Sequence, residues 1–569
     1  EDKYSQDQRV TLRAFGSFYA QFDFGSISSA LDGLKYRVNF GPDITAYRNG
    51  VFLDGLSSMR AGTSYASLSK NQTISYTLDH LLFYNKTLGN HNFGLTLLQS
   101  QTQYNNESTA MSANNVANVA NKWNALTPSN VTLADYSSGL TETGLLSYMG
   151  RVNYGYADKY LITASGRYDA ASQLAPGNKW AFFPSTALAW RLDKEDFLKD
   201  VSWVNQLKLR AGYGITGNAA VAAYATQPPL VGIVHPFGSG LSNNTSLGNL
   251  DLTWEKTTQY NYGVDFSILN SRISGSLEYY TSKTTDLLLS RTIPTVTGFA
   301  TTLENVGATE GNGVELTLNT VNVKTADFEW SSSLSASWQK SKIVELQNGK
   351  FDDINNTRFI GQPQGIIYGF ASNGIWKPED AAEMAKFNAN SAGFSFGNAR
   401  PVDQNGDYKI DANDRVIIGS TEPKFVTGLT NTFNYKNFEL SFFIYGRMNY
   451  LSSAGAENLS GKTSQRVLDY YTENNINAAY QKPIYSAATG DQYHPTLGYL
   501  DGSFLKIRNI SLGYNFTDEL AEKIGVSKLR MYLQASNPGM LFSKAKWMDF
   551  DTQTTYSNRG FTLGLNVQF

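Results

Sequence analysis

Alternation of apolar and polar residues, repeated in segment after segment, is the feature that most constrains the fold of this chain. Successive side chains of a β-strand point to opposite faces, so the pattern predicts strands with one apolar and one polar face. The same alternation occurs around residues 146–156, 207–215, 273–279 and 438–444, and most cleanly in Phe561, Leu563, Leu565, Val567 and Phe569. Many segments reach the about 9–11 residues that a tilted membrane-spanning strand requires.

The connections between the predicted strands alternate between short and long. Counting back from Phe569 gives about seventeen strands. The short connections are 89–90, 157–159, 269–271, 325–327 and 436–437, and two somewhat longer ones, 193–203 and 517–527, are expected to form single helical turns. The long connections are 51–70, 111–138, 219–252, 347–423 and 451–503. Outer-membrane barrels sort their loops in this way, with the short turns in the periplasm. The predicted fold is therefore an all-β, transmembrane antiparallel β-barrel.

An odd number of strands predicts that residues 1–569 form only a portion of such a barrel, with long extracellular loops. Bacterial single-chain barrels have an even number of strands. An open edge in lipid would leave backbone groups without partners, at a cost of several kcal/mol each. We therefore expect the first strands of the barrel to lie outside this sequence.

Composition excludes several classes of protein. The net charge of −2 and the pI near 6.2 give no electrostatic basis for nucleic-acid binding. The chain has no Cys, which excludes disulfides and thiolate metal sites. No run approaches the roughly 18–20 apolar residues of a spanning helix. The string 212–217 matches G-x-G-x-x-G only formally, because it ends a strand pattern and leads into a loop rather than a helix. No other motif supports an enzyme.

One segment has the spacing of a calcium-binding loop. Oxygen ligands are expected at its positions 1, 3, 5, 9 and 12, with a backbone carbonyl at position 7. Position 6 is Tyr408 instead of Gly, and position 12 is Asp instead of Glu. The alternative is a polar turn without metal. A possible structural Ca²⁺ would be held by Asp403, Asn405, Asp407, Lys409, Asp411 and Asp414.

Aromatic residues in the long loops are candidates for substrate contact, because aromatic rings stack on sugars and pack on peptide side chains. The loops 347–423 and 451–503 exceed the length of a simple connector, which favours a functional role. The candidates are Phe359, Tyr368, Phe370, Trp376 and Tyr493.

Several strings resemble the SusC/RagA group of TonB-dependent transporters of Bacteroidetes-type bacteria. They are NYGYADKYLITAS at 153–165, LKLRA at 207–211, LTWEKT at 252–257 and SFLKIRN at 503–509. The final Phe569 resembles the terminal aromatic residue read by the barrel-assembly machinery. The resemblance extends over essentially the whole chain. It implies the C-terminal part of a 22-stranded barrel, whose N-terminal plug is absent from this sequence. Tyr408 departs from the Gly that is usual in the group.

The resemblance also implies a function. Such a protein imports oligosaccharides or peptides across the bacterial outer membrane, surrounded by outer-membrane lipid. It works with a SusD-like surface lipoprotein as lid, and the TonB–ExbB–ExbD complex acts through the plug. Alternatives are a siderophore- or cobalamin-type receptor without a lid, a passive porin, and a structural surface barrel or adhesin. None of these interpretations involves catalysis, and none requires a cofactor other than the possible calcium ion.

Overall fold

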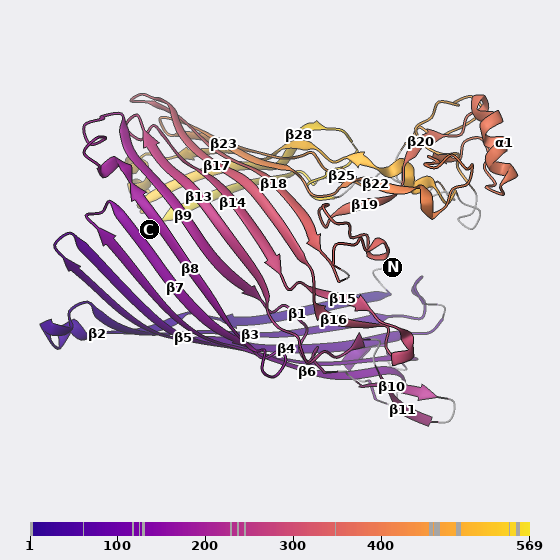
Figure 1. Ribbon diagram of the computed structural model, residues 1–569, viewed down its shortest axis with the longest axis horizontal. Coiled ribbons are helices and arrows are strands. Elements are labelled where there is room, and N and C mark those ends of the chain that lie inside the picture. Colours follow the sequence, from indigo (N-terminus) through magenta and orange to yellow (C-terminus); the bar gives the residue numbers. More distant parts are fainter. Residues whose placement is uncertain are drawn as a thin grey trace. The chain divides into compact units, whose positions relative to one another are not determined.

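The computed structural model consists mainly of long antiparallel strands (Figure 1). It describes residues 4–569 except 61, 117–118, 125, 128–130, 228–229, 236–237, 244–245, 348, 454–458, 460–466, 485–490, 546 and 554–557. Parts of the predicted loops 111–138, 219–252, 347–423 and 451–503 therefore lie outside the described residues. The chain divides into two compact units. The first contains Glu1–Arg191, Ala211–Tyr260 and Thr284–Gly307, and the second contains Leu192–Arg210, Asn261–Lys283 and Ala308–Phe569.

The long strands follow one another along the chain. The first unit contains β1 (Ser5–Phe15), β2 (Phe18–Asp23), β3 (Leu34–Leu53), β4 (Tyr65–Leu88), β5 (His91–Asn114), β6 (Thr132–Tyr156), β7 (Tyr160–Ala171) and β8 (Trp180–Arg191). The second contains β17 (Ala308–Lys324), β18 (Phe328–Glu345), β23 (Phe425–Tyr435), β24 (Phe438–Met448), β27 (Phe504–Asn515), β28 (Lys528–Ser543) and β29 (Gly560–Gln568). Residues of both units occur in β9 (Val204–Asn218), β13 (Glu255–Ile268) and β14 (Ile273–Thr285).

Shorter elements occupy the connections. The strands are β10 (Leu230–His235), β11 (Gly238–Asn243), β12 (Ser246–Leu247), β15 (Leu288–Thr292), β16 (Thr301–Asn305), β19 (Ile366–Phe370), β20 (Ser372–Ile375), β21 (Ala399–Pro401), β22 (Arg415–Ser420), β25 (Leu451–Ser452) and β26 (Leu500–Asp501). The α-helices are α1 (Ala381–Ala389) and α2 (Asp518–Lys523). Single 3₁₀ turns include η4 (Leu192–Lys194) and η10 (His494–Gly498). The two predicted helical turns, after Asp193 and Thr517, are thus close to η4 and α2.

The predicted strand number agrees with the structure. Among the described residues, the main sheet comprises eighteen strands. However, β1 and β2 both pair with β3, one with each half of it, and only Gly16 and Ser17 separate them. Counting β1 and β2 as one interrupted strand leaves seventeen. The fold is therefore the all-β antiparallel one that the alternation predicts.

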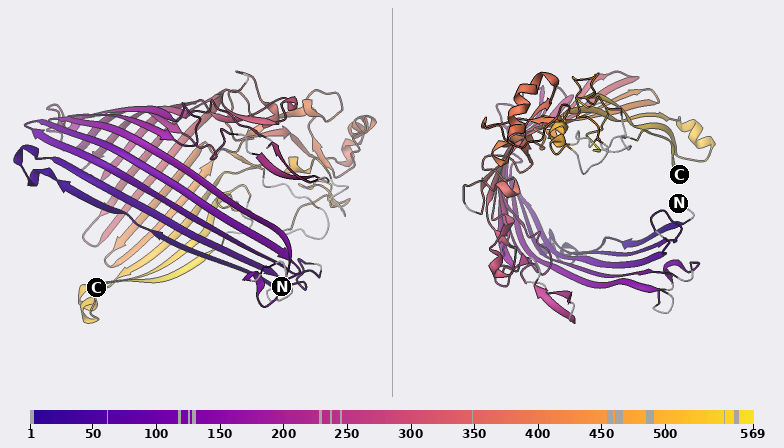
Figure 2. Two further views of the ribbon diagram at one scale, coloured as in Figure 1. Left: turned by 90° about the horizontal axis from the view of Figure 1, so that it is seen from below. Right: turned by 90° about the vertical axis from the view of Figure 1, so that its right-hand side faces the viewer.

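The strands of the first unit have one apolar and one polar face. In the ladder of β3 and β4, Ile44 lies opposite Ile74, and each side chain is 43 % exposed. The next pair along the ladder, Asp43 and Ser75, lies on the other face. Figure 2 shows β3 to β6 running side by side over their whole length. Rows of exposed apolar side chains on one face are the arrangement that a membrane strand presents to lipid.

The second unit repeats this arrangement. Leu440 pairs with Leu512, Leu512 with Leu533, and Leu533 with Leu563, so one apolar row crosses β24, β27, β28 and β29. These four side chains are between 37 % and 71 % exposed. On the other face, Arg530 forms an ion pair with Glu439 at 2.7 Å. The described residues leave this apolar row exposed, which is unfavourable in water and favourable in a bilayer.

Aromatic rings mark both ends of the apolar face in the first unit. Near the long loops, Tyr168 stacks on Trp180 with ring centroids 4.6 Å apart. At the short-turn end, Tyr160 stacks on Trp190 at 6.4 Å, and Tyr156 lies opposite Tyr160. Two aromatic girdles bounding an apolar band are typical of outer-membrane barrels.

The turns and loops differ in one respect from the prediction. The short turn 157–159 has positive φ angles of 51° at Ala157 and 55° at Asp158, as a tight hairpin requires. However, β3 and β4 continue to Leu53 and from Tyr65, so their connection is 54–64 rather than 51–70. Likewise β5 ends at Asn114 and β6 begins at Thr132, so their connection is 115–131 rather than 111–138. The predicted boundaries were wrong because the ladders continue through polar sequence, where the alternation carries no apolar signal.

Among the described residues, no helix combines the length and apolar character needed to cross a membrane.

Candidate functional site

The longest connections of the second unit fold into a small structure of their own. We call residues 366–422 together with 467–484 and 491–503 the outer loop module. Two short ladders, β19 with β22 and β20 with β21, form its frame, and α1 lies beside β20 (Figure 1). Trp376 N–H bonds to the carbonyl of Asn398 at 2.8 Å, which continues the second ladder. The module is therefore a folded element and not an irregular loop.

Aromatic side chains form the core of the outer loop module. Trp376 is fully buried at 0 % exposure, and its ring lies 5.5 Å from that of Phe387 and 5.3 Å from that of Phe394. Arg400 covers the indole at 4.7 Å and forms ion pairs with Asp380 at 2.8 Å and with Glu383 of α1. Arg400 thus fixes the start of α1 to the tryptophan, by charge on one side and by packing on the other.

The five predicted substrate aromatics are all close to this module, but they differ in accessibility. Phe359 is buried and packs at 4.8 Å against Tyr368. Phe370 and Tyr493 are half-buried and meet edge to face at 5.5 Å, and Trp376 is inside the core. Of the five residues, Tyr368, Phe370 and Tyr493 are thus half-buried, and the other two are buried. Substrate contact by these rings stays a prediction.

Tyr493 connects the two long loops. Its hydroxyl donates to the carbonyl of Ile410 at 3.5 Å, and burial raises the pKa of Tyr493. The side chain of Asp491 accepts a hydrogen bond from the backbone N–H of Ala399. The loop around Asp491 is therefore fastened to the first loop by polar contacts.

The predicted calcium loop adopts the turn that calcium loops require. Tyr408, at position 6, has a φ of 58°, the left-handed conformation for which Gly is preferred. Asp403 accepts the backbone N–H groups of Gly406 and Tyr408 at 2.7 and 2.8 Å. The fully buried Asp414 accepts those of Gln404 and Asp411, both at 2.8 Å. The Tyr at position 6 therefore does not prevent the turn.

The candidate calcium ligands do not converge on one point as the turn does on its own hydrogen bonds. Asn405 and Asp407 direct their oxygens into local turns of the backbone. Asp411 caps the short helical turn that contains Asn413. The described part of the chain contains no group of three or more His, Asp or Glu side chains placed to hold a metal ion. Calcium binding would therefore require these side chains to turn inward, and it stays a prediction.

Calcium binding can be tested on the loop directly. If the predicted ligands bind Ca²⁺, millimolar Ca²⁺ should slow hydrogen exchange of residues 403–414 in the full-length protein, because the metal replaces the local turns by direct coordination. Asp403→Ala should abolish this effect, whereas Glu379→Ala, which removes an exposed carboxylate of the same module, should preserve it. Equal exchange with and without Ca²⁺ in the wild type would show that the loop is a metal-free turn.

A second segment packs on the polar face of β24 and β27. It consists of residues 544–551, which follow β28, and we call it the packed segment; Lys546 is outside the described residues. Phe504 of β27 is fully buried against Ala545, Met548 and Phe550 of this segment. This apolar cluster lies on the polar face of the sheet, so the packed segment covers that face at β27.

Ion pairs fasten the packed segment. Lys506 of β27 is 1 % exposed, and its ammonium is 2.5 Å from Asp549 and 3.4 Å from Asp551. Arg508 holds Asp551 with two hydrogen bonds of 2.9 and 2.6 Å, and its guanidinium lies 3.8 Å above the ring of Tyr445. Both aspartates are thus paired inside the fold.

A β-bulge explains why the sequence did not reveal this network. Below the bulge, odd-numbered residues of β27 such as Ser511 share the polar face with Ser441. The register shifts near Arg508, and Lys506 then lies opposite Tyr445 on that same face. The bulge therefore reverses which residues face which side. Continued alternation would have placed Lys506 on the apolar face.

The charge of Asp551 gives a pH dependence to the packed segment. Burial by itself would raise the pKa of the Asp551 carboxyl, but hydrogen bonding to Arg508 and the charges of Arg508 and Lys506 outweigh burial and lower it. A carboxyl with a lowered pKa contributes stability that is complete above its unfolded value of about 3.9 and is lost as the pH falls through the folded value. We expect hydrogen exchange of residues 547–553, corrected for the intrinsic rate, to stay constant from pH 7 to 5 and to rise below about pH 4.

Asp551→Asn provides the control for this pH dependence. It should show faster exchange already at pH 7, with little further rise on acidification. A wild-type segment that loosens between pH 7 and 5 would contradict the assignment to Asp551.

Residues 2–537 match the family model described as TonB dependent receptor-like, beta-barrel. The chain is 30 % identical to TonB-dependent receptor P3 of Formosa agariphila, over 99 % of this chain and 59 % of that protein. It is 29 % identical to TonB-dependent receptor SusC of Bacteroides thetaiotaomicron, over 94 % of this chain and 55 % of that protein. The chain thus spans a little more than half the length of these relatives.

The fold has a close counterpart among solved structures. The structure of the RagAB peptide transporter superposes with a TM-score of 0.82, over 100 % of this chain and 63 % of that one, at 21 % sequence identity. At this identity the superposition supports the fold and not the cargo. The resemblance to the SusC and RagA group is confirmed by these matches.

Proposed function

Because the chain belongs to the TonB-dependent receptor-like β-barrel family, we propose that it forms the wall and outer loops of an outer-membrane importer of the SusC/RagA type. The observation that carries the proposal is the match to this family along residues 2–537, and the relationship to SusC over 94 % of the chain supports it. The apolar rows and aromatic girdles support a position in the outer membrane. No covalent chemistry is part of the proposal.

The proposed cargo class is oligosaccharides or peptides. One relative is named SusC, and the protein of similar fold is called a peptide transporter. Cargo would bind on the side of the long loops, where Tyr368, Phe370 and Tyr493 are only half-buried. Uptake would depend on TonB–ExbB–ExbD.

A surface lipoprotein of the SusD type is the proposed partner. The outer loop module supports this, because a prefolded element at the end of the wall offers a fixed surface to a partner, whereas an irregular loop would lose conformational entropy on binding. The lipoprotein would close over the long-loop end and hold the cargo there.

Purification and uptake together test this function. The full-length protein, tagged and isolated from the outer membrane of its own host, should retain a lipoprotein, and every retained polypeptide should be identified by mass. In whole cells, uptake of labelled oligosaccharides or peptides should stop when a protonophore removes the energy source of TonB. Cells lacking the gene provide the background.

Other outcomes would identify the alternatives. Energy-dependent uptake of an iron chelate or cobalamin, with no retained lipoprotein, would indicate a receptor without a lid. Uptake that continues after protonophore treatment would indicate a passive porin. No uptake of any of these solutes would leave a structural barrel or adhesin.

A further inference from the structure

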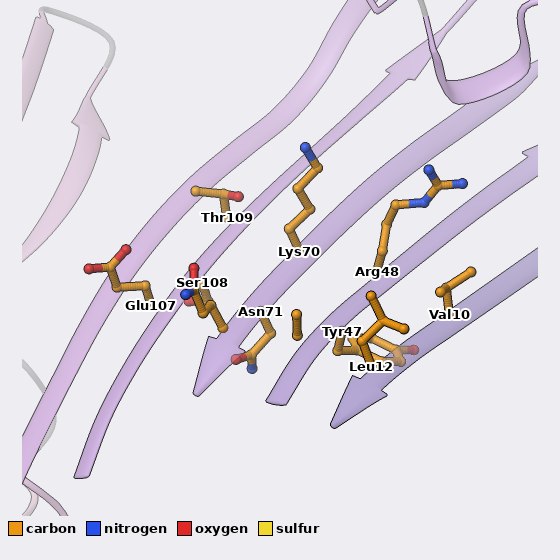
Figure 3. Close-up of a pocket in the computed structure, with 11 residues that line it drawn as sticks. Val10, Leu12, Tyr47, Arg48, Lys70, Asn71, Glu107, Ser108 and Thr109 are labelled. Atoms are coloured by element: carbon orange, nitrogen blue, oxygen red, sulfur yellow. The ribbon is translucent and has the colours of Figure 1, made fainter. Parts of the chain in front are cut away.

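A hollow on the apolar face of the first unit contains two basic side chains side by side. Its volume is about 460 Å³, and it lies across β1, β3, β4 and β5 (Figure 3). Arg48 of β3 and Lys70 of β4 are direct cross-strand partners. Figure 3 shows both side chains extending to the same side of the ribbon. Directly opposed side chains have Cβ atoms about 4.5–5.5 Å apart, so the two basic side chains start from neighbouring positions on the sheet.

The two cations have no acidic partner in the described part of the chain. Arg48 donates to the neutral Gln8 at 2.8 Å, and its Nε is buried without a hydrogen-bond acceptor. Glu107 also lines the hollow, but its cross-strand partner is Gln72, and it forms no ion pair with either cation there. Two like charges placed opposite each other are destabilising. The pair thus lacks a compensating negative charge.

Two arginines on the polar face, in contrast, have carboxylate partners. Arg13 of β1 binds Asp43 of β3 through two hydrogen bonds, of 2.9 and 2.6 Å. Arg167 is paired with Asp169 at 2.8 Å. These two arginines of the polar face thus have carboxylate partners, whereas Arg48 and Lys70 have none among the described residues. An external anion would satisfy them.

Position indicates which anion this is. Arg48 and Lys70 are on the long-loop side of the apolar residues Ile44 and Ile74 of the same face. Long loops of an outer-membrane barrel point outward, so the pair lies at the outer boundary of the lipid band. Below it, Leu12 is 70 % exposed and lies opposite Ala46, which gives an apolar wall for acyl chains.

We propose that Arg48 and Lys70 bind the phosphate of a phosphorylated lipid of the outer leaflet. The phosphate oxygens would accept charge-assisted hydrogen bonds from the guanidinium and the ammonium, while the acyl chains follow Val10, Leu12 and Ala46. This inference rests on the proposed position of the chain in the outer membrane, but it is independent of the cargo. It gives the wall a specific lipid contact.

Native mass spectrometry of the full-length protein tests the proposal. The protein is released from detergent micelles that contain bisphosphorylated lipid A or the same lipid with its phosphates removed. We expect retention of the phosphorylated form only, and about tenfold weaker retention by the Arg48→Gln/Lys70→Gln double variant. Lys70 is exposed, and Lys70→Gln alone should lose part of the lipid retention. Lys70→Arg keeps the positive charge and should retain the lipid as the wild type does.

Lys86→Gln is the matched control. Lys86 is on the same strand and the same face, opposite Phe93 at the short-turn end, so its loss should not affect lipid retention. Equal retention by the double variant and the wild type would overturn the proposal. So would an equal loss in Lys86→Gln, or complete displacement of the lipid by inorganic phosphate, which would indicate a simple anion site.

The failure of this inference is distinguishable from failure of the proposed function. If only the lipid site is wrong, the double variant retains lipid and also imports cargo. If the outer-membrane assignment is wrong, the wild-type protein is absent from the outer-membrane fraction and retains neither lipid. Cell fractionation of the wild type is therefore the first step.

Discussion

Lys506→Met is expected to lower the free energy of unfolding by about 3–5 kcal/mol, because it leaves a buried aspartate without its partner. The ammonium of Lys506 is 2.5 Å from Asp549, and their side chains are 2 % and 4 % exposed. Methionine keeps the length and apolar stem of lysine, so the loss reflects the charge and not a cavity. The measurement is denaturant-induced unfolding of the full-length protein in detergent, with hydrogen exchange of residues 547–553 as a local readout.

Lys283→Met is the control for this substitution. Lys283 forms a more open ion pair with Glu310, at 3.6 Å and with 51 % of its side chain exposed. Such a pair contributes about 0–1 kcal/mol. If Lys506→Met costs no more than Lys283→Met, the network does not fasten the packed segment.

Trp376→Ala is expected to destabilise the outer loop module by about 3–5 kcal/mol. The indole is fully buried against Phe387 and Phe394, and its removal leaves a cavity beneath Arg400. The loss should appear first in the module, as faster hydrogen exchange of α1. Unfolding of the strands should change little.

Two variants sharpen this test. The indole Nε1 of Trp376 is buried and has no hydrogen-bond partner among the described residues, so Trp376→Phe gives up no hydrogen bond seen there and should cost clearly less than Trp376→Ala. Phe351→Ala removes an aromatic ring that is 73 % exposed in the same long connection, and it should change stability by less than about 0.5 kcal/mol. Unchanged exchange of α1 in Trp376→Ala would show that the module is held by other contacts.

Much of the fold could be predicted from the sequence, because alternation is a local property. Leu563 and Leu565 share the exposed apolar face that their spacing predicts, and the hairpin at Ala157 forms where the short connection was expected. The candidate site could be predicted less well. The length of the connection that contains Trp376 marks it as a candidate, but the burial of Trp376 depends on Phe387 and Phe394, which approach the indole only through the fold of the connection.

The sequence by itself determined the all-β antiparallel class of the fold, the number of strands in the described main sheet, and the sorting of long and short loops to opposite ends of the strands. These follow from the period of two and from the order of long and short connections, which each stretch of chain carries alone. Only the tertiary structure decided the contacts between distant segments. The bulge near Arg508 turned Lys506 toward Asp549, and the register of β3 and β4 placed Arg48 beside Lys70. Such contacts depend on pairing register and on loop folding, and a shift of one residue reverses the face of every side chain.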